Sequence, residues 1–182
     1  MLTSTTAKAV IASILLPSGL AKLTNRRSFV EAVRGFDLLP KLAIPPFAFT
    51  LPLVEIVVGG TLLIGAVFEW LGTEWSAAAA VCLFAMFGAA VLINLLRGRA
   101  NVACGCFGGG GRKLTWALAG RSLLCLLISL LALPHLHRVP VDSGNIADRL
   151  NAALLGTALV AVVWLGEFLI NGGIRLFQSP SS

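Results

Sequence analysis

Two cysteines separated by a single glycine, Cys104 and Cys106, are the residues whose types and spacing most directly allow chemistry. Their Cα atoms can approach to about 7 Å, at the edge of the disulfide range, and Gly105 frees the backbone between them. A disulfide in so small a ring is strained, and strained disulfides are more easily reduced. The spacing therefore predicts thiol–disulfide chemistry at Cys104 and Cys106.

The surroundings of this pair favour a reactive thiol. Positive charge stabilises the thiolate, which is the form of cysteine that reacts. The nearby cations are Arg97, Arg99, Arg112 and Lys113. A zinc site is one alternative, although a structural zinc takes four ligands and this segment supplies two. A purely structural pair is the other alternative. We expect neither a metal nor another cofactor.

The remaining cysteines, Cys82 and Cys125, fall inside apolar stretches. A helix rises about 1.5 Å per residue, so the depths of these two thiols differ by about one turn. One hypothesis is a second thiol pair that relays electrons from Cys104 and Cys106 towards the far ends of the helices. The other is packing, because free cysteine is among the most commonly buried residues.

Three charged residues, Glu55, Arg121 and Glu167, interrupt apolar stretches. Charges inside a membrane are costly and mark a functional site or an internal ion pair. Arg121 and Cys125 are four residues apart and share a helix face. We expect Arg121 to act on the thiol of Cys125, or to form a structural clamp with Glu55. Glu167 lies near the end of its stretch, where the membrane surface is expected.

The composition explains why such charges matter. Of the 182 residues, 57% are hydrophobic and only 12% are charged, whereas an ordinary soluble domain is about 25% charged. The mean hydropathy is +0.91. The chain is therefore predicted to be an integral membrane protein in contact with lipid. The net charge of +6 reports topology, and we expect no nucleic-acid partner.

The predicted fold is an all-α membrane bundle of four to five transmembrane helices. A span needs about 20 mainly apolar residues. Residues 9–21 fall short of this and can span only if Lys8 and Lys22 extend towards the membrane surfaces. We expect this segment to be a retained helix rather than a cleaved signal peptide. The further predicted spans are residues 47–70, 75–96, 114–133 and 152–174.

Two other patterns bear on the packing of these helices. Residues 25–42 place Phe29, Val33 and Phe36 at helical spacing, which predicts an amphipathic helix at the membrane interface after the first span. Glycines 59 and 60 and the small residues 88–90 favour close helix packing. We predict a four-helix core over residues 1–134, with residues 135–182 adding a loop and a C-terminal transmembrane helix.

Lysine and arginine predict the orientation, because they are enriched in cytoplasmic loops. One side of the predicted bundle holds ten of them and the other side holds three. The ten-residue side includes the Cys104–Cys106 connection, which is therefore expected in the cytoplasm with the N-terminus outside. The ten are Lys22, Arg26, Arg27, Arg34, Lys41, Arg97, Arg99, Arg112, Lys113 and Arg175; the three are Lys8, Arg138 and Arg149.

Several segments resemble a known family. Residues 18–23 (SGLAKL), 29–40 and 51–55 (LPLVE) resemble the first half of DoxX-like membrane proteins. Residues 97–99 (RGR), followed by 104–108 (CGCFG) and by Arg121 in the next helix, are similar to the methylamine-utilisation MauE branch. The resemblance covers roughly residues 10–130, and its cysteine element is the more specific part.

This resemblance implies a role in maturing the small (β) subunit of methylamine dehydrogenase, in a bacterial inner membrane. That subunit is exported and carries several disulfides, and a thioredoxin-like periplasmic partner is implied beside it. Cys104 and Cys106 match the family's cysteine pair, and Glu55 and Arg121 match its intramembrane charges. We expect a thiol–disulfide function, with possible enzymatic character. The alternatives are a non-redox membrane chaperone or transport subunit and a quinone-linked oxidoreductase.

Overall fold

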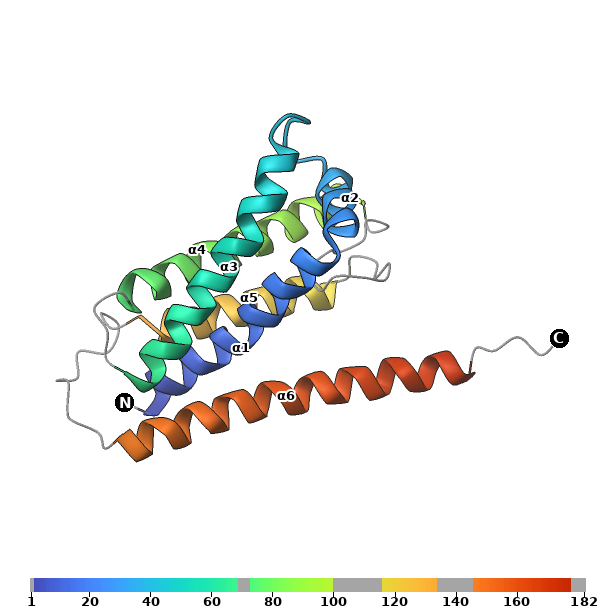
Figure 1. The fold of residues 1–182 in the computed structure, drawn as a ribbon. Coiled ribbons are helices and arrows are strands. Elements are labelled where there is room, and N and C mark those ends of the chain that lie inside the picture. The colour runs from blue at the N-terminus through green and yellow to red at the C-terminus, as the bar shows by residue number, and fades with distance from the viewer. Residues whose placement is uncertain (1, 69–72, 100–115, 134–145, 178–182) are drawn as a thin grey trace.

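The computed structural model describes residues 2–68, 73–99, 116–133 and 146–177, and the regular structure in these ranges is helical throughout. In Figure 1, α1, α3, α4 and α5 run alongside one another, while α2 lies at one end and α6 extends along α1. The all-α fold class is therefore confirmed. The helices are α1 (Leu2–Thr24), α2 (Arg26–Phe36), α3 (Ile44–Val67), α4 (Thr73–Leu96), α5 (Trp116–Leu131) and α6 (Ile146–Phe177).

Within the described residues, three helices are long and apolar enough to cross a membrane. They are α1 from Ser4 onwards, α3 and α4. A shorter apolar helix covers Leu118–Leu131 in α5. Several such helices in one chain make this a multi-pass membrane protein, because an apolar stretch of this length is more stable in the hydrocarbon core of a bilayer than in water. The predicted fifth span, residues 152–174, lies within α6, and its passage through the membrane stays a prediction.

The first helix is longer than residues 9–21. It begins at Leu2 and has 23 residues, or roughly 35 Å at about 1.5 Å per residue, which matches the apolar thickness of a bilayer of about 30 Å. Lys22 does not extend towards the surface as expected, because its side chain is buried to 1% exposure inside the bundle. The helix therefore continues beyond both ends of the apolar run at residues 9–21.

Close contact between α1 and α3 depends on two glycines. A Cβ atom at Gly19 would lie 2.8 Å from Cγ1 of Ile56 and 2.9 Å from the carbonyl oxygen of Pro52. At Gly59 it would lie 3.0 Å from Cγ of Leu16. Small residues let two backbones approach in this way. The packing prediction is thus confirmed at Gly59 and wrong at Gly60, around which there is open space.

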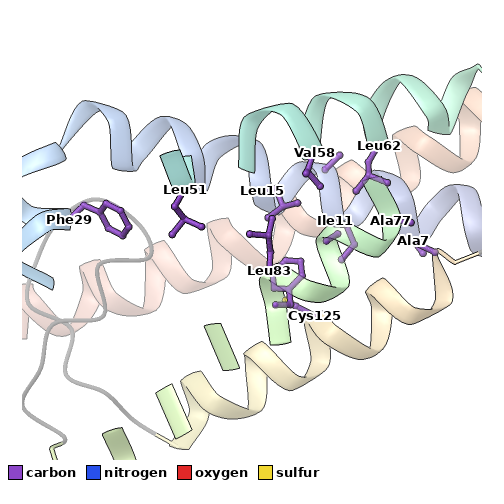
Figure 2. Close-up of a cluster of buried hydrophobic side chains, with 14 of the residues drawn as sticks. Ala7, Ile11, Leu15, Phe29, Leu51, Val58, Leu62, Ala77, Leu83 and Cys125 are labelled. Carbon is purple, nitrogen blue, oxygen red and sulfur yellow. The ribbon is translucent and has the colours of Figure 1, made fainter. Parts of the chain in front are cut away.

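The hydrophobic core lies where α1, α3, α4 and α5 meet. Figure 2 shows Leu15 of α1, Val58 of α3 and Leu83 of α4 converging there, with the thiol of Cys125 from α5 beside Leu83. On α1 the buried residues Ile11, Leu15, Ser18 and Lys22 recur every three or four residues and share the face that points into the bundle.

The C-terminal helix packs against α1 through small residues. A Cβ atom at Gly156 would lie 3.0 Å from the carbonyl oxygen of Thr6 and 3.3 Å from Cβ of Ala9. Ala9 is fully buried, and Ala153 belongs to the same small cluster. The predicted C-terminal addition therefore contacts the first helix directly, although it comes last in the chain (Figure 1).

Candidate functional site

A buried ion pair lies at the centre of the bundle. The ammonium of Lys22 on α1 donates to Oε1 of Glu55 on α3, and the two side chains are 1% and 0% exposed. Lys22 lies on the inward face of α1 because it follows Ser18 by four residues and Leu15 by seven. The Gly19 contact brings α3 close enough for Glu55 to reach it.

Two aromatic rings complete the surroundings of the ammonium. Nζ of Lys22 lies 4.6 Å from the ring centroid of Phe87 on α4 and 5.4 Å from that of Phe29 on α2. Rings at these distances attract a cation through their electron-rich faces. Ser18, one turn before Lys22, lies beside the carboxylate of Glu55. Four helices thus converge on one charge pair.

The expected clamp between Glu55 and Arg121 is corrected by this arrangement, since the cation bound to Glu55 is Lys22. Arg121 instead lines a small cavity of about 50 Å³ between α1, α4 and α5. Cys125 lines the same cavity, so the prediction that Arg121 and Cys125 share a helix face is confirmed. Ser18 and Lys22 also line this cavity, which places Arg121 near the ion pair.

A larger apolar groove, of about 430 Å³, lies between α2, α3 and α4. It and the small cavity share Lys22, Phe87 and Val91 as walls. Among the described residues that line it, Lys22 is the one with a charge, and that charge is paired with Glu55. The groove is lined by Lys22, Phe29, Ala32, Val33, Phe36, Leu38, Leu39, Phe47, Leu51, Met86, Phe87, Ala89, Ala90, Val91 and Ile93.

The described chain reaches to within five residues of the first cysteine of the motif. Cys104 and Cys106 themselves lie outside the described residues. Helix α4 ends in a Schellman motif: Gly98 has a φ of +71° and donates to the carbonyl of Leu95, while the amide of Arg99 donates to that of Asn94. This turn directs Arg99 to Asp37, with 3.0 Å between Nη1 and Oδ2.

The contact between Arg99 and Asp37 also bears on topology. It places the end of α4 beside the end of α2, so the connection that contains the cysteine motif starts where the first connection lies. This agrees with the assignment of both connections to one side of the membrane. Lys22, however, is buried and no longer counts as a loop charge. The excess of cations on this side persists without it.

The other two cysteines lie in opposite environments. Cys125 is 6% exposed in the core, whereas Cys82 is exposed on α4. Both thiols are free. Among the described residues there is no cluster of three or more side chains suited to a metal. The electron relay through Cys82 and Cys125 stays a hypothesis, with Cys125 alone facing the small cavity.

Sequence reasoning missed several buried polar residues, of which Lys22 and Asn94 have the largest side chains. Lys22 was assigned to the surface, although its spacing from Ile11 and Leu15 places it on the buried face of α1. Asn94 is fully buried near the end of α4, and its Nδ2 donates to the carbonyl oxygen of Ala90 at 3.0 Å. In the described part of the chain, Oδ1 of Asn94 and Oε2 of Glu55 have no hydrogen-bond partner.

The fold and this site define the chain as a multi-pass helical membrane protein with a buried lysine–glutamate pair, whose sequence also carries a Cys-Gly-Cys motif. The family model described as "Methylamine utilisation protein MauE" matches residues 1–134. The chain belongs to this family. It is therefore a member of the methylamine utilisation proteins, and the resemblance inferred from the sequence is confirmed.

Individual relatives extend the match beyond residue 134. The methylamine utilization protein MauE of Paracoccus denitrificans is 32% identical over 94% of this chain and 88% of its own length. The protein of the same name from Methylorubrum extorquens is 36% identical over 93% and 87%, and that of Methylophilus methylotrophus is 25% identical over 91% and 84%. No solved structure matches the chain.

Proposed function

We propose that this protein supports maturation of the small subunit of methylamine dehydrogenase by thiol–disulfide exchange at Cys104 and Cys106. The observation that carries the proposal is the Cys-Gly-Cys motif in a chain of the MauE family. In each exchange a thiolate of one protein attacks the disulfide of the other, and a second thiolate resolves the mixed disulfide. Each exchange thus oxidises two thiols of one protein and reduces one disulfide of the other, with transfer of two electrons.

The described neighbourhood of the motif favours this chemistry. Arg97 and Arg99 are exposed at the end of α4, where the segment with the cysteines begins. Their charge favours thiolates nearby. A thioredoxin-like periplasmic protein is the proposed redox partner, which would restore the oxidation state of the pair after each exchange. If the pair faces the cytoplasm, as the charges predict, electrons must cross the bilayer to reach this partner; if the orientation is reversed, the exchange is direct.

The test is complementation of a methylamine-using bacterium that lacks its own copy of this protein. We expect Cys104→Ser and Cys106→Ser each to abolish growth on methylamine and to leave the small subunit without its full set of disulfides. The amount of each variant in the membrane should equal that of the wild type. Normal growth of both variants would reject thiol exchange and favour a non-redox chaperone or transport role.

The same assay tests the relay, with Cys82→Ala and Cys125→Ala as the matched pair. Exposed Cys82 and buried Cys125 are both expected to tolerate this change if they serve packing alone. Loss of small-subunit disulfides in both variants, at a normal protein level, would instead support a relay through the bundle.

A further inference from the structure

We propose that the apolar groove between α2, α3 and α4 binds one acyl chain of an anionic phospholipid, with the headgroup held by Arg97 and Lys41 at its mouth. The groove, at about 430 Å³, falls within the range of about 300–1,000 Å³ typical of ligand sites. Its rim exposes Leu38, Met86 and Ile93 to between 37% and 38%. The groove is thus open to the surrounding lipid.

The inner end of the groove decides how a ligand must be oriented. Lys22 is the charged residue there, and it is already bound to Glu55 and covered by Phe29 and Phe87. A polar headgroup would find no uncompensated charge at this depth, and burying it without a partner is costly. An apolar chain faces no such cost. The ligand therefore enters with its apolar end first, and its polar end stays outside.

Two basic residues follow lining residues of the groove closely in the chain, and the nearby carboxylate of Asp37, between Phe36 and Leu38, is already paired with Arg99. Arg97 follows Ile93 by one turn and continues the same helix face, because its amide donates to the carbonyl oxygen of Ile93 at 3.0 Å. Lys41 is exposed two residues after Leu39, which lines the groove. Basic sites beside transmembrane helices bind anionic headgroups. Charge complementarity thus favours an anionic phospholipid over a zwitterionic one.

Helix α2 provides a matched control for these charges. On α2, Phe29, Val33 and Phe36 face the groove, whereas Arg27 and Arg34 are exposed about half a turn away from that face. Replacing Arg27 and Arg34 removes the same charge from the same end of the bundle without touching the mouth. On α4, Ala90 lines the groove, and exposed Ala85 does not.

The experiment measures stabilisation of the full-length protein by added phosphatidylglycerol or phosphatidylcholine in detergent, together with the lipids that co-purify. Ligands that bind the folded state raise its apparent stability. We expect phosphatidylglycerol to stabilise the wild type and Ala85→Phe, and to have no effect on Ala90→Phe. The Arg97→Gln/Lys41→Gln variant should bind it about 30-fold more weakly, and Arg27→Gln/Arg34→Gln should behave as the wild type.

Three results would overturn the proposal. One is equal stabilisation of Ala90→Phe and Ala85→Phe by phosphatidylglycerol. Another is equal affinity of the two charge variants, which remains decisive if Ala90→Phe does not fold. The third is co-purification of a quinone, rather than a phospholipid, that is lost from the groove variants. The thiol chemistry at Cys104 and Cys106 is not needed for any of these measurements.

Discussion

The charges of Lys22 and Glu55 stabilise each other inside the bundle, where both side chains are buried. An isolated charge in such a medium costs several kcal/mol, and the cost falls when an opposite charge and hydrogen bonds accompany it. Lys22 has a carboxylate and two aromatic rings as partners. The energetic consequence is that neither residue is expendable while the other remains.

Single replacements at this pair should therefore be more harmful than the double replacement. We expect Lys22→Met and Glu55→Leu each to lower the free energy of unfolding by about 3–5 kcal/mol, because each leaves one buried charge without its partner. The double variant should lose much less than the sum. Unfolding of the four proteins in mixed micelles measures this directly as a double-mutant cycle.

A strictly additive cycle would contradict this account. It would mean that Lys22 and Glu55 contribute independently, and that the ion pair between them adds nothing to the stability of the bundle.

At the scale of helices, the approach of α1 to α3 sets the geometry of the site. Gly19 lies three residues before Lys22 on α1, and it contacts the turn of α3 that carries Glu55. Without this contact the two helices would lie further apart, and Lys22 could no longer reach Glu55. The pair and the glycine thus form one structural unit on two helices.

Alanine should lower the free energy of unfolding at Gly19 but not at Gly60. Gly19→Ala adds a Cβ 2.9 Å from the carbonyl oxygen of Pro52, and we expect a loss of about 1–3 kcal/mol from overpacking. Gly60→Ala meets nothing within 4 Å and should be neutral or stabilise α3 by up to about 1 kcal/mol. Unfolding in mixed micelles checks both, and equal effects would argue against close packing at Gly19.

The position of each end of the bundle relative to the membrane is a property of the whole molecule. The α2 end carries the larger number of cations, including exposed Arg26, Arg27, Arg34, Lys41, Arg97 and Arg99. The positive-inside rule predicts that this end faces the cytoplasm. Asp37 marks this end by its contact with Arg99, and exposed Glu74 at the start of α4 marks the other.

Cysteine labelling in intact cells tests the orientation. In a background with all four native cysteines replaced, we expect Asp37→Cys to resist a membrane-impermeant maleimide and to react with a permeant one. Glu74→Cys should react with both reagents. The reverse pattern would place the cysteine motif on the periplasmic side, directly facing an exported client. The expected pattern would instead require electrons to cross the bilayer in order to reach that client.

The sequence predicted the helical class, and it predicted the α3 and α4 spans to within three residues. It also predicted the amphipathic α2, although this helix ends at Phe36, six residues before the predicted end. These features depend on apolar length and on helical periodicity, which are local. It was less accurate for α1, because Lys8 and Lys22 were taken as the limits of the span. Helices continue through a lysine when a partner is available inside the bundle, and no local pattern identifies that partner.

Apolar length, the cysteine pair and the charges within apolar stretches were sufficient to indicate a multi-pass membrane protein, and the motifs indicated its family. The partner of Glu55 became known from the three-dimensional arrangement: it is Lys22, 33 residues earlier in the chain, while Arg121 and Cys125 line a neighbouring cavity. The physical reason is that hydrophobicity and periodicity act along one helix, whereas the partner of a buried charge depends on which helix faces meet. That meeting is set by close contacts such as the one at Gly19, and the apolar groove beside α2 is a consequence of the same packing.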